Sequence, residues 1–189
     1  AVFFVGALFF TAASTIQGRL AWREVSPQER ALAGKHVGRV LRIRNLDWAS
    51  AWIQWVGTIF FISTTLRTLL DATGATSPSA TQIWRPDAIG SILFLVSSGI
   101  TLIPEVNKRR HGHARDRAWG IAAVNMLGSI FFGISAVGAY VEPSTGQIAN
   151  LGWADGGTFL GAVCFLVGAL MVLPRRGDRV QASPPPGEA

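Results

Sequence analysis

Reactive and charged side chains are scarce in this 189-residue chain. The sequence contains one cysteine, Cys164, so it can form neither an internal disulfide framework nor a CxxC redox pair. Charged residues make up only 15% of the chain, whereas an average soluble domain has about 25%. Disulfide scaffolds and thiol redox proteins are thereby excluded, and Cys164 is expected to be a small apolar packing residue.

The sequence also lacks the residue sets that carry common chemistry. It has no nucleophile–base pair, no paired carboxylates inside an apolar run, no phosphate-binding glycine loop and no haem-type histidine pair. His111 and His113 share a loop, but zinc takes three or four ligands and Asp116 is the only other ligand at suitable spacing. We therefore predict no catalytic, cofactor-binding or metal-binding residues, and we expect the protein not to be an enzyme.

Long apolar runs are what the sequence has in quantity. Hydrophobic residues make up 49% of the chain, and helices of about 20 such residues can cross the ~30 Å hydrocarbon layer of a membrane. The predicted spans are residues 1–17, 50–70, 88–106, 118–141 and 150–173. These runs predict an all-α, polytopic membrane bundle of five transmembrane helices, with residues 1–174 as one transmembrane domain.

Basic residues lie on alternate connections between these runs. Fifteen of the 17 lysines and arginines fall within 18–49, within 107–117 or after residue 174, and the other two are Arg67 and Arg85. The positive-inside rule places the basic connections and the C-terminus in the cytoplasm, with residue 1 outside. A nucleic-acid surface would not need this alternation, so nucleic acid is not an expected partner. Residues 175–189 are predicted to be a disordered cytoplasmic tail.

The basic loop 18–49 has a candidate partner of its own. Ser26-Pro-Gln-Glu29 combines an N-cap serine with a first-turn proline and a glutamate three residues on, which predicts a helix over 27–44. Such a basic segment can bind anionic lipid headgroups, or it can serve only as a positive-inside anchor. The excess of arginine over lysine is typical of GC-rich bacterial genomes. The expected location is the bacterial inner membrane, and the bilayer, a second copy of the chain or another membrane protein are the candidate partners.

A short motif recurs once in every apolar run. It consists of glycine, a small residue, an aliphatic residue, one variable residue and phenylalanine, and we call it the Gly–Phe motif. Its copies are Gly6–Phe10, Gly57–Phe61, Gly90–Phe94, Gly128–Phe132 and Gly161–Phe165. The second and third glycines are 33 residues apart, as are the fourth and fifth. This spacing predicts two copies of one helical hairpin, related as parallel repeats by an axis along the membrane normal.

The first apolar run matches the second helix of such a hairpin. We expect its partner helix to precede residue 1, which would give six spans in the full-length protein. The alternative is a signal peptide, because Thr11-Ala-Ala-Ser14 resembles a small-residue cleavage site. A signal peptide also needs a basic leader, which this sequence does not display, and the Gly–Phe motif at Gly6 favours a genuine span.

The Gly–Phe motif predicts how the helices pack. Helices in lipid associate through close approach at small residues and through a few polar contacts. Phenylalanine four residues after glycine lies on the same helix face, so a ring can fill the space beside a neighbour's glycine. Gly157, Gly161 and Gly168 form the clearest small-residue stripe, whereas Gln54 and Asn125 are expected to bond between helices or, alternatively, to line a polar permeation site.

Charged residues near the span ends are the remaining candidates for function. Arg67 and Asp155 both lie about one turn from the outer end of a span. They can form a charged vestibule for an ion or proton, or they can simply reach the membrane surface with their polar ends. Tryptophans near span ends predict an aromatic belt, with Trp52, Trp55, Trp84, Trp119 and Trp153 as its members.

Two segments resemble a known family. Asn125-Met-Leu-Gly-Ser-Ile-Phe-Phe132 and the run from Gly157 to Pro174 are similar to the bacterial YrhK-like membrane proteins, with the resemblance extending over 50–174. The resemblance implies a small multi-span membrane protein and brings no established activity. The leading hypothesis is a non-enzymatic structural or partner-binding component of the inner membrane. The alternative is a small transporter or channel with a polar path between the two hairpins.

Overall fold

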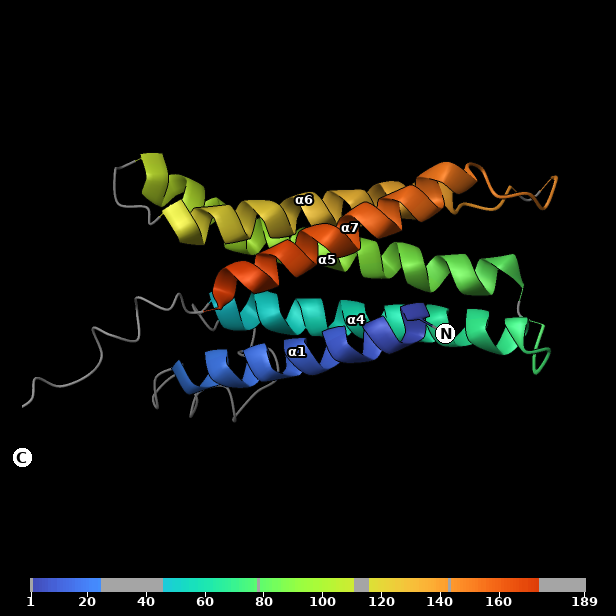
Figure 1. Ribbon diagram of the computed structural model, residues 1–189, viewed down its shortest axis with the longest axis horizontal. Helices are drawn as coiled ribbons and strands as arrows, with labels where there is room; N and C mark the ends of the chain where they lie inside the picture. Colours follow the sequence, from blue (N-terminus) through green and yellow to red (C-terminus); the bar gives the residue numbers. More distant parts are fainter. Residues whose placement is uncertain (1, 25–45, 78, 111–115, 143, 174–189) are drawn as a thin grey trace, which may run out of the picture.

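The computed structural model describes residues 2–24, 46–77, 79–110, 116–142 and 144–173 of the chain (Figure 1). The described residues form five α-helices: α1 (Val2–Glu24), α4 (Leu46–Ala72), α5 (Ala80–Arg110), α6 (Asp116–Gly138) and α7 (Leu151–Val172). All five are long and apolar enough to cross a membrane. The prediction of an all-α bundle with five helices of spanning length is confirmed.

The helices run back and forth along one common direction. Two antiparallel pairs, α4 with α5 and α6 with α7, have their connecting turns at the same end of the bundle, which we call the turn end (Figure 1). We call the opposite end the loop end. Helix α1 packs on α4, and α5 packs on α6, so the two pairs are joined side by side through α5 and α6. Each pair is referred to below as a hairpin.

Most helices are longer than the apolar runs that predicted them. Helix α5 covers 80–110 instead of 88–106, and it contains Pro86 and Pro104. Helix α1 continues to Glu24 and α4 begins at Leu46, so both ends of the predicted loop 18–49 are helical. Long basic side chains can lay their stems on an apolar helix while their charges stay in water. A helix can therefore continue beyond its last apolar residue.

Helix α6 instead ends three residues before the predicted limit of 141. A Cβ atom added to Gly138 would lie 2.6 Å from the backbone nitrogen of Ala154, so α6 and α7 nearly touch there. The chain then leaves the helix, and Val141 and Ile148 form an isolated antiparallel bridge. Gly146 has φ of +67°, a conformation that glycine adopts without strain. This tight turn replaces the last predicted residues of the span.

Two sequence predictions fall outside the described residues. These are the helix expected over 27–44 and the disordered tail over 175–189. His111 and His113 also lie in an undescribed segment.

The interior of the bundle contains small and hydroxyl-bearing residues more than large apolar ones. Buried apolar residues include Phe94, Phe165 and several alanines, while nine of the described serines and threonines are buried. Large apolar side chains lie outside instead: Phe9 is 74% exposed and Phe159 is 67% exposed. This distribution is typical of helices that pack through small residues and turn their large apolar side chains toward lipid.

Candidate functional site between the helices

In the α4–α5 hairpin, each helix places a phenylalanine against the other helix's glycine. A Cβ added to Gly57 of α4 would lie 3.6 Å from the ring of Phe94 on α5. A Cβ added to Gly90 of α5 would lie 3.0 Å from the ring of Phe61 on α4. The two Gly–Phe motifs therefore interlock reciprocally, as the sequence predicted.

The α6–α7 hairpin contains the same interlock. A Cβ on Gly128 would lie 3.1 Å from the ring of Phe165, and one on Gly161 would lie 3.1 Å from the ring of Phe132. Each of these four residues lies 71 positions after its counterpart in the first hairpin, as Gly57 and Gly128 illustrate. The prediction that rings fill the space beside a neighbouring glycine is thus confirmed in both hairpins.

The phenylalanines of all five motifs meet in one aromatic cluster at the centre of the bundle. Phe10, Phe94 and Phe165 form a triangle, with ring centroids 5.4, 5.0 and 5.7 Å apart. Phe61 and Phe132 join this triangle and lie 5.3 Å from each other. Aromatic pairs at such separations stabilise a structure beyond their buried area. The cluster joins α1 to α7, the first and last of the described helices.

Hydroxyl groups make equivalent interhelical bonds in the two hairpins. Thr64 of α4 donates to the carbonyl of Ile83 on α5, at 3.1 Å. Ser135 of α6 donates to the carbonyl of Ala154 on α7, at 2.6 Å. Ser135 lies 71 positions after Thr64, and Ala154 lies 71 positions after Ile83. The correspondence between the hairpins therefore extends beyond the Gly–Phe motif.

The two predicted amide residues behave differently. Ser97 of α5 donates to Gln54 of α4 over 3.4 Å and also bonds Ser50, so the predicted interhelical bond of Gln54 is present. Asn125, the counterpart of Gln54, packs against Gly168 instead, where an added Cβ would lie 2.5 Å from its Oδ1. The structure gives the Asn125 side chain no hydrogen bond to any described residue. Glycine at 168 leaves the room that the amide fills.

Bonds between neighbouring hairpins involve residues that were not predicted to contact another helix. Ser98 of α5 and Ser129 of α6 share a hydrogen bond of 2.7 Å. Trp84 of α5 donates from its indole nitrogen to the carbonyl of Ala136, at 2.8 Å. These contacts close the seam between α5 and α6. Ser129 directly follows the glycine of a Gly–Phe motif, and a serine at that position could have been used to predict a buried contact between hairpins.

The tryptophans predicted as an aromatic belt lie in different environments. Trp84 and Trp55 are interhelical donors, because Trp55 bonds the hydroxyl of Thr15 on α1 at 2.9 Å. Trp153 is 57% exposed, as a belt residue should be. Trp119 lies under the guanidinium of Arg109, 4.2 Å from its ring centre. A tryptophan near a span end can thus face either the membrane surface or a neighbouring helix.

Arg67 and Asp155 do not form an ion pair in the described structure. Arg67 donates to the backbone carbonyl of Gln82 at 2.7 Å, which ties the end of α4 to the start of α5. Asp155 is exposed in the first turns of α7. Among the described residues, the ion pair present joins Lys108 and Glu105 within α5. These positions fit individual interfacial charges better than a paired vestibule.

Among the described ionisable residues, Asp87 has an unusual position. It lies near the turn end of α5, within the candidate membrane span Thr81–Arg110, and is only partly exposed. None of the described residues forms a hydrogen bond or ion pair with its carboxyl group. Its counterpart 71 positions later is Thr158, whose hydroxyl bonds Ser135 at 2.7 Å. Carboxylates inside membrane spans are rare, which makes Asp87 a candidate for function.

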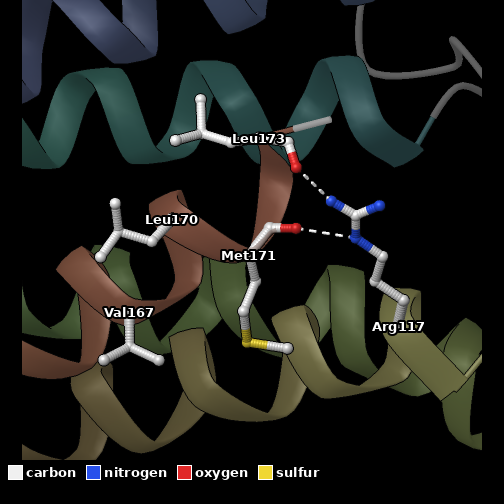
Figure 2. Close-up of a pocket in the computed structure, with 5 residues that line it drawn as sticks. All are labelled: Arg117, Val167, Leu170, Met171 and Leu173. Atoms are coloured by element: carbon white, nitrogen blue, oxygen red, sulfur yellow. Dashed lines mark hydrogen bonds between the residues drawn. The ribbon is translucent and has the colours of Figure 1, made fainter. Parts of the chain in front are cut away.

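A cavity of 320 Å³ opens at the loop end, between α6 and α7 (Figure 2). Its walls are apolar except for Arg117, which bonds the carbonyl oxygens of Met171 and Leu173. These carbonyls belong to the last turn of α7 and its end, where a cation is favourable. Because the guanidinium caps α7, the cavity offers apolar walls and an engaged cation rather than a reactive group.

Comparison of the chain with protein-family models, with curated proteins and with solved structures gives no match.

Proposed function

We propose that this protein is a non-enzymatic integral membrane protein that acts as a structural or partner-binding component. The observation that carries this proposal is how the centre of the bundle is occupied. Five phenylalanine rings meet there, and each of the nine buried hydroxyl residues has a hydrogen bond. Such an interior is suited to holding helices together, since its buried hydroxyl groups are already hydrogen-bonded.

The proposal includes a location and an evolutionary origin. Exposed large apolar side chains and helices of spanning length support insertion in a bilayer. The distribution of lysine and arginine supports the bacterial inner membrane, with the loop end and the C-terminus in the cytoplasm. The recurrence of contacts at 71 residues supports two parallel copies of one hairpin. Membership of a YrhK-like family would agree with this architecture.

Cysteine labelling tests the proposed topology. Ser144→Cys and Ala182→Cys are each introduced into a Cys164→Ala background, so that one thiol is present. A membrane-impermeant maleimide should label Ser144→Cys in intact cells, and Ala182→Cys only after the cells are permeabilised. Labelling of both sites in intact cells would contradict the orientation. Recovery of the protein from the soluble fraction would contradict membrane insertion.

Asp87 favours a small transporter or channel as the second candidate function. A carboxyl group that bonds none of the described residues, near the end of a candidate membrane span, can take up a proton or bind a cation. In this alternative the path runs between the hairpins, with Arg67 and Asp155 near its outer mouth. Proteoliposomes should then pass protons or small cations, and Asp87→Asn should abolish the flux. Flux no greater than in empty liposomes would favour the structural function.

A further inference from the structure

The second helix of each hairpin presents the same four positions to its partner. They are the motif glycine and the third, fourth and seventh residues after it, and we call them the hairpin face. On α5 the third residue, Leu93, has its Cβ 3.3 Å from a Cβ added to Gly57. On α7 the equivalent Cys164 has its Cβ 3.1 Å from a Cβ added to Gly128. The full sets are Gly90, Leu93, Phe94 and Ser97 on α5, and Gly161, Cys164, Phe165 and Gly168 on α7.

Helix α1 carries the same hairpin face, but most of it is uncovered. A Cβ added to Gly6 meets nothing within 4 Å, although the equivalent glycines of α5 and α7 are buried. Phe9, the counterpart of Leu93 and Cys164, is 74% exposed, and Ala13 is also exposed. The fourth member, Phe10, reaches the aromatic cluster. α1 is therefore placed as the second helix of a hairpin, with the partner's side open.

Helix α7 has an uncovered face of a different kind. On α5, Ser91 and Ser98 are buried against α6, where Ser91 donates to the carbonyl of Phe132. The counterparts of these serines on α7 are Ala162 and Ala169, and both are exposed. This is the face that joins one hairpin to the next. On α7 it is small, apolar and unoccupied by any described helix.

The uncovered faces of α1 and α7 lie on either side of the contact between these two helices. The rings of Phe10 and Phe165 are 5.0 Å apart, so α1 and α7 approach each other at the aromatic cluster. Yet their backbones do not pack closely as those of neighbouring helices do. In Figure 1 the two ribbons lie on the same side of the bundle and diverge. We call these two uncovered faces, the hairpin face of α1 and the face of α7 that carries Ala162 and Ala169, the α1–α7 groove.

We propose that this groove holds one further membrane helix, antiparallel to α1 and supplied by the polypeptide that precedes Ala1. Its chemistry follows from what α4 and α6 share. It should have an amide residue, glycine three positions later, serine or threonine next, phenylalanine four positions after the glycine, and a further hydroxyl residue three positions after that. The phenylalanine would fill the space beside Gly6. Three hairpins would then surround the triangle of Phe10, Phe94 and Phe165.

A second copy of the chain is a poor occupant for this groove. The glycines and phenylalanines of its α4 and α6 are already interlocked with their own partners. The open face of its α1 would run parallel to α1 when both copies have the same orientation in the membrane. The observed Gly–Phe interlock joins antiparallel helices. The proposal depends on the correspondence between the hairpins and is independent of whether the protein transports a solute.

Disulfide cross-linking tests the groove on the 189-residue chain. The chain carries Cys164→Ala and Phe9→Cys, and the probe is a synthetic peptide of residues 116–138 with Gly128→Cys. Both are placed in phospholipid nanodiscs and oxidised. Cys164 and Gly128 are neighbours in the second hairpin, so Phe9→Cys should meet the peptide's thiol in the same way. Proximity should give about tenfold more cross-linked product than a lipid-facing control.

Val5→Cys is the matched control. Val5 is 49% exposed on the same helix, and its counterparts Ile89 and Leu160 remain 42% and 44% exposed in complete hairpins. Adding Gly6→Leu to the Phe9→Cys chain should fill the groove and reduce the product to the control level. Equal yields from Phe9→Cys and Val5→Cys would overturn the proposal. Dimers linked through Phe9→Cys without peptide would identify a second copy as the occupant and would also overturn it.

The source of the helix is tested separately. The reading frame before Ala1 should encode an apolar run with the amide, glycine, hydroxyl and phenylalanine spacing given above. In the chain extended by that run, Phe9→Cys should become protected from a maleimide that labels it in the 189-residue chain. Cross-linking to the peptide without such a run in the reading frame would show that the occupant comes from another subunit, contrary to the proposal.

Discussion

The two hairpins hold their helices together at the same positions by different means. In the first hairpin the polar residues Ser50, Gln54 and Ser97 bond across the α4–α5 interface. In the second, Gly157 and Gly168 let α6 and α7 approach more closely. Pro86 occupies the position on α5 that corresponds to Gly157 on α7. At the equivalent positions 97 and 168, the hydrogen bonds of Ser97 in the first hairpin are replaced in the second by close packing of Gly168 against the Asn125 side chain, while the interlocked glycines and phenylalanines remain in both.

The largest effect is expected when the close contact of the second hairpin is blocked. A Cβ at Gly157 would lie 2.6 Å from the carbonyl oxygen of Phe131 and 2.7 Å from the backbone nitrogen of Ser135. Backbone atoms cannot rotate away, so Gly157→Ala should separate α6 and α7 and cost about 3 kcal/mol or more. Thermal unfolding in detergent measures the loss.

The neighbouring glycine provides the control for this variant. A Cβ added to Gly156 meets nothing within 4 Å. Gly156→Ala should therefore leave the unfolding temperature unchanged or raise it slightly, because alanine is the better helix former. Equal destabilisation by Gly156→Ala and Gly157→Ala would contradict a specific backbone contact.

A smaller effect is expected at Gly168, where the obstacle is a side chain. Gly168→Ala would meet the Oδ1 of Asn125 at 2.5 Å and should cost about 1–2 kcal/mol. Shortening the amide with Asn125→Ala should restore much of this loss, so the double variant should be more stable than the sum of the single effects predicts. Unfolding temperatures of the four proteins in one detergent measure the coupling. Strict additivity would show that the two residues do not meet.

The polar contact of the first hairpin should contribute about 1 kcal/mol. Ser97 is buried and bonds Ser50 and Gln54, so Ser97→Ala removes these bonds while leaving the helix intact. The control is Thr81→Ala, because Thr81 is exposed on the same helix. Ser97→Ala should lower the unfolding temperature relative to this control. A difference indistinguishable from zero would mean that hydrogen bonding does not distinguish the first hairpin from the second.

The smallest effect is expected from the charge at the start of α7. Asp155 is exposed, and it forms no ion pair with any described residue. Asp155→Asn should therefore change stability by no more than about 0.5 kcal/mol. Stability and solute flux are measured on the same purified variant. A large loss of flux without a loss of stability would contradict the interfacial role and would favour a vestibule.

The sequence predicts the helices and the reciprocal interlock well, for identifiable physical reasons. Hydrocarbon thickness fixes the length of an apolar run, and glycine with phenylalanine four residues on marks one helix face. The convergence of Phe10 with Phe165 was not predictable, because it depends on how the bundle brings α1 and α7 together. The sequence predicts Trp84 at the membrane surface because the residues near a span end do not show which helix lies alongside. In the structure α6 lies there, and the carbonyl of Ala136 accepts a hydrogen bond from the Trp84 indole. The hydrogen bond of Arg67 was likewise not predictable, because it depends on the turn between α4 and α5 that brings the carbonyl of Gln82 close to the guanidinium.

The interlock of glycine and phenylalanine also restricts how the bundle can move. If one helix shifted lengthwise by a single turn, about 5.4 Å, each phenylalanine ring would leave the space beside its partner's glycine. It would then collide with another side chain of that helix. Axial sliding within a hairpin therefore carries a steric penalty at two places at once. Tilting of whole hairpins about the aromatic cluster keeps the rings beside their glycines. Any large motion of this protein should therefore be a tilt of one hairpin relative to another about this cluster, and not an axial sliding of one helix along its partner.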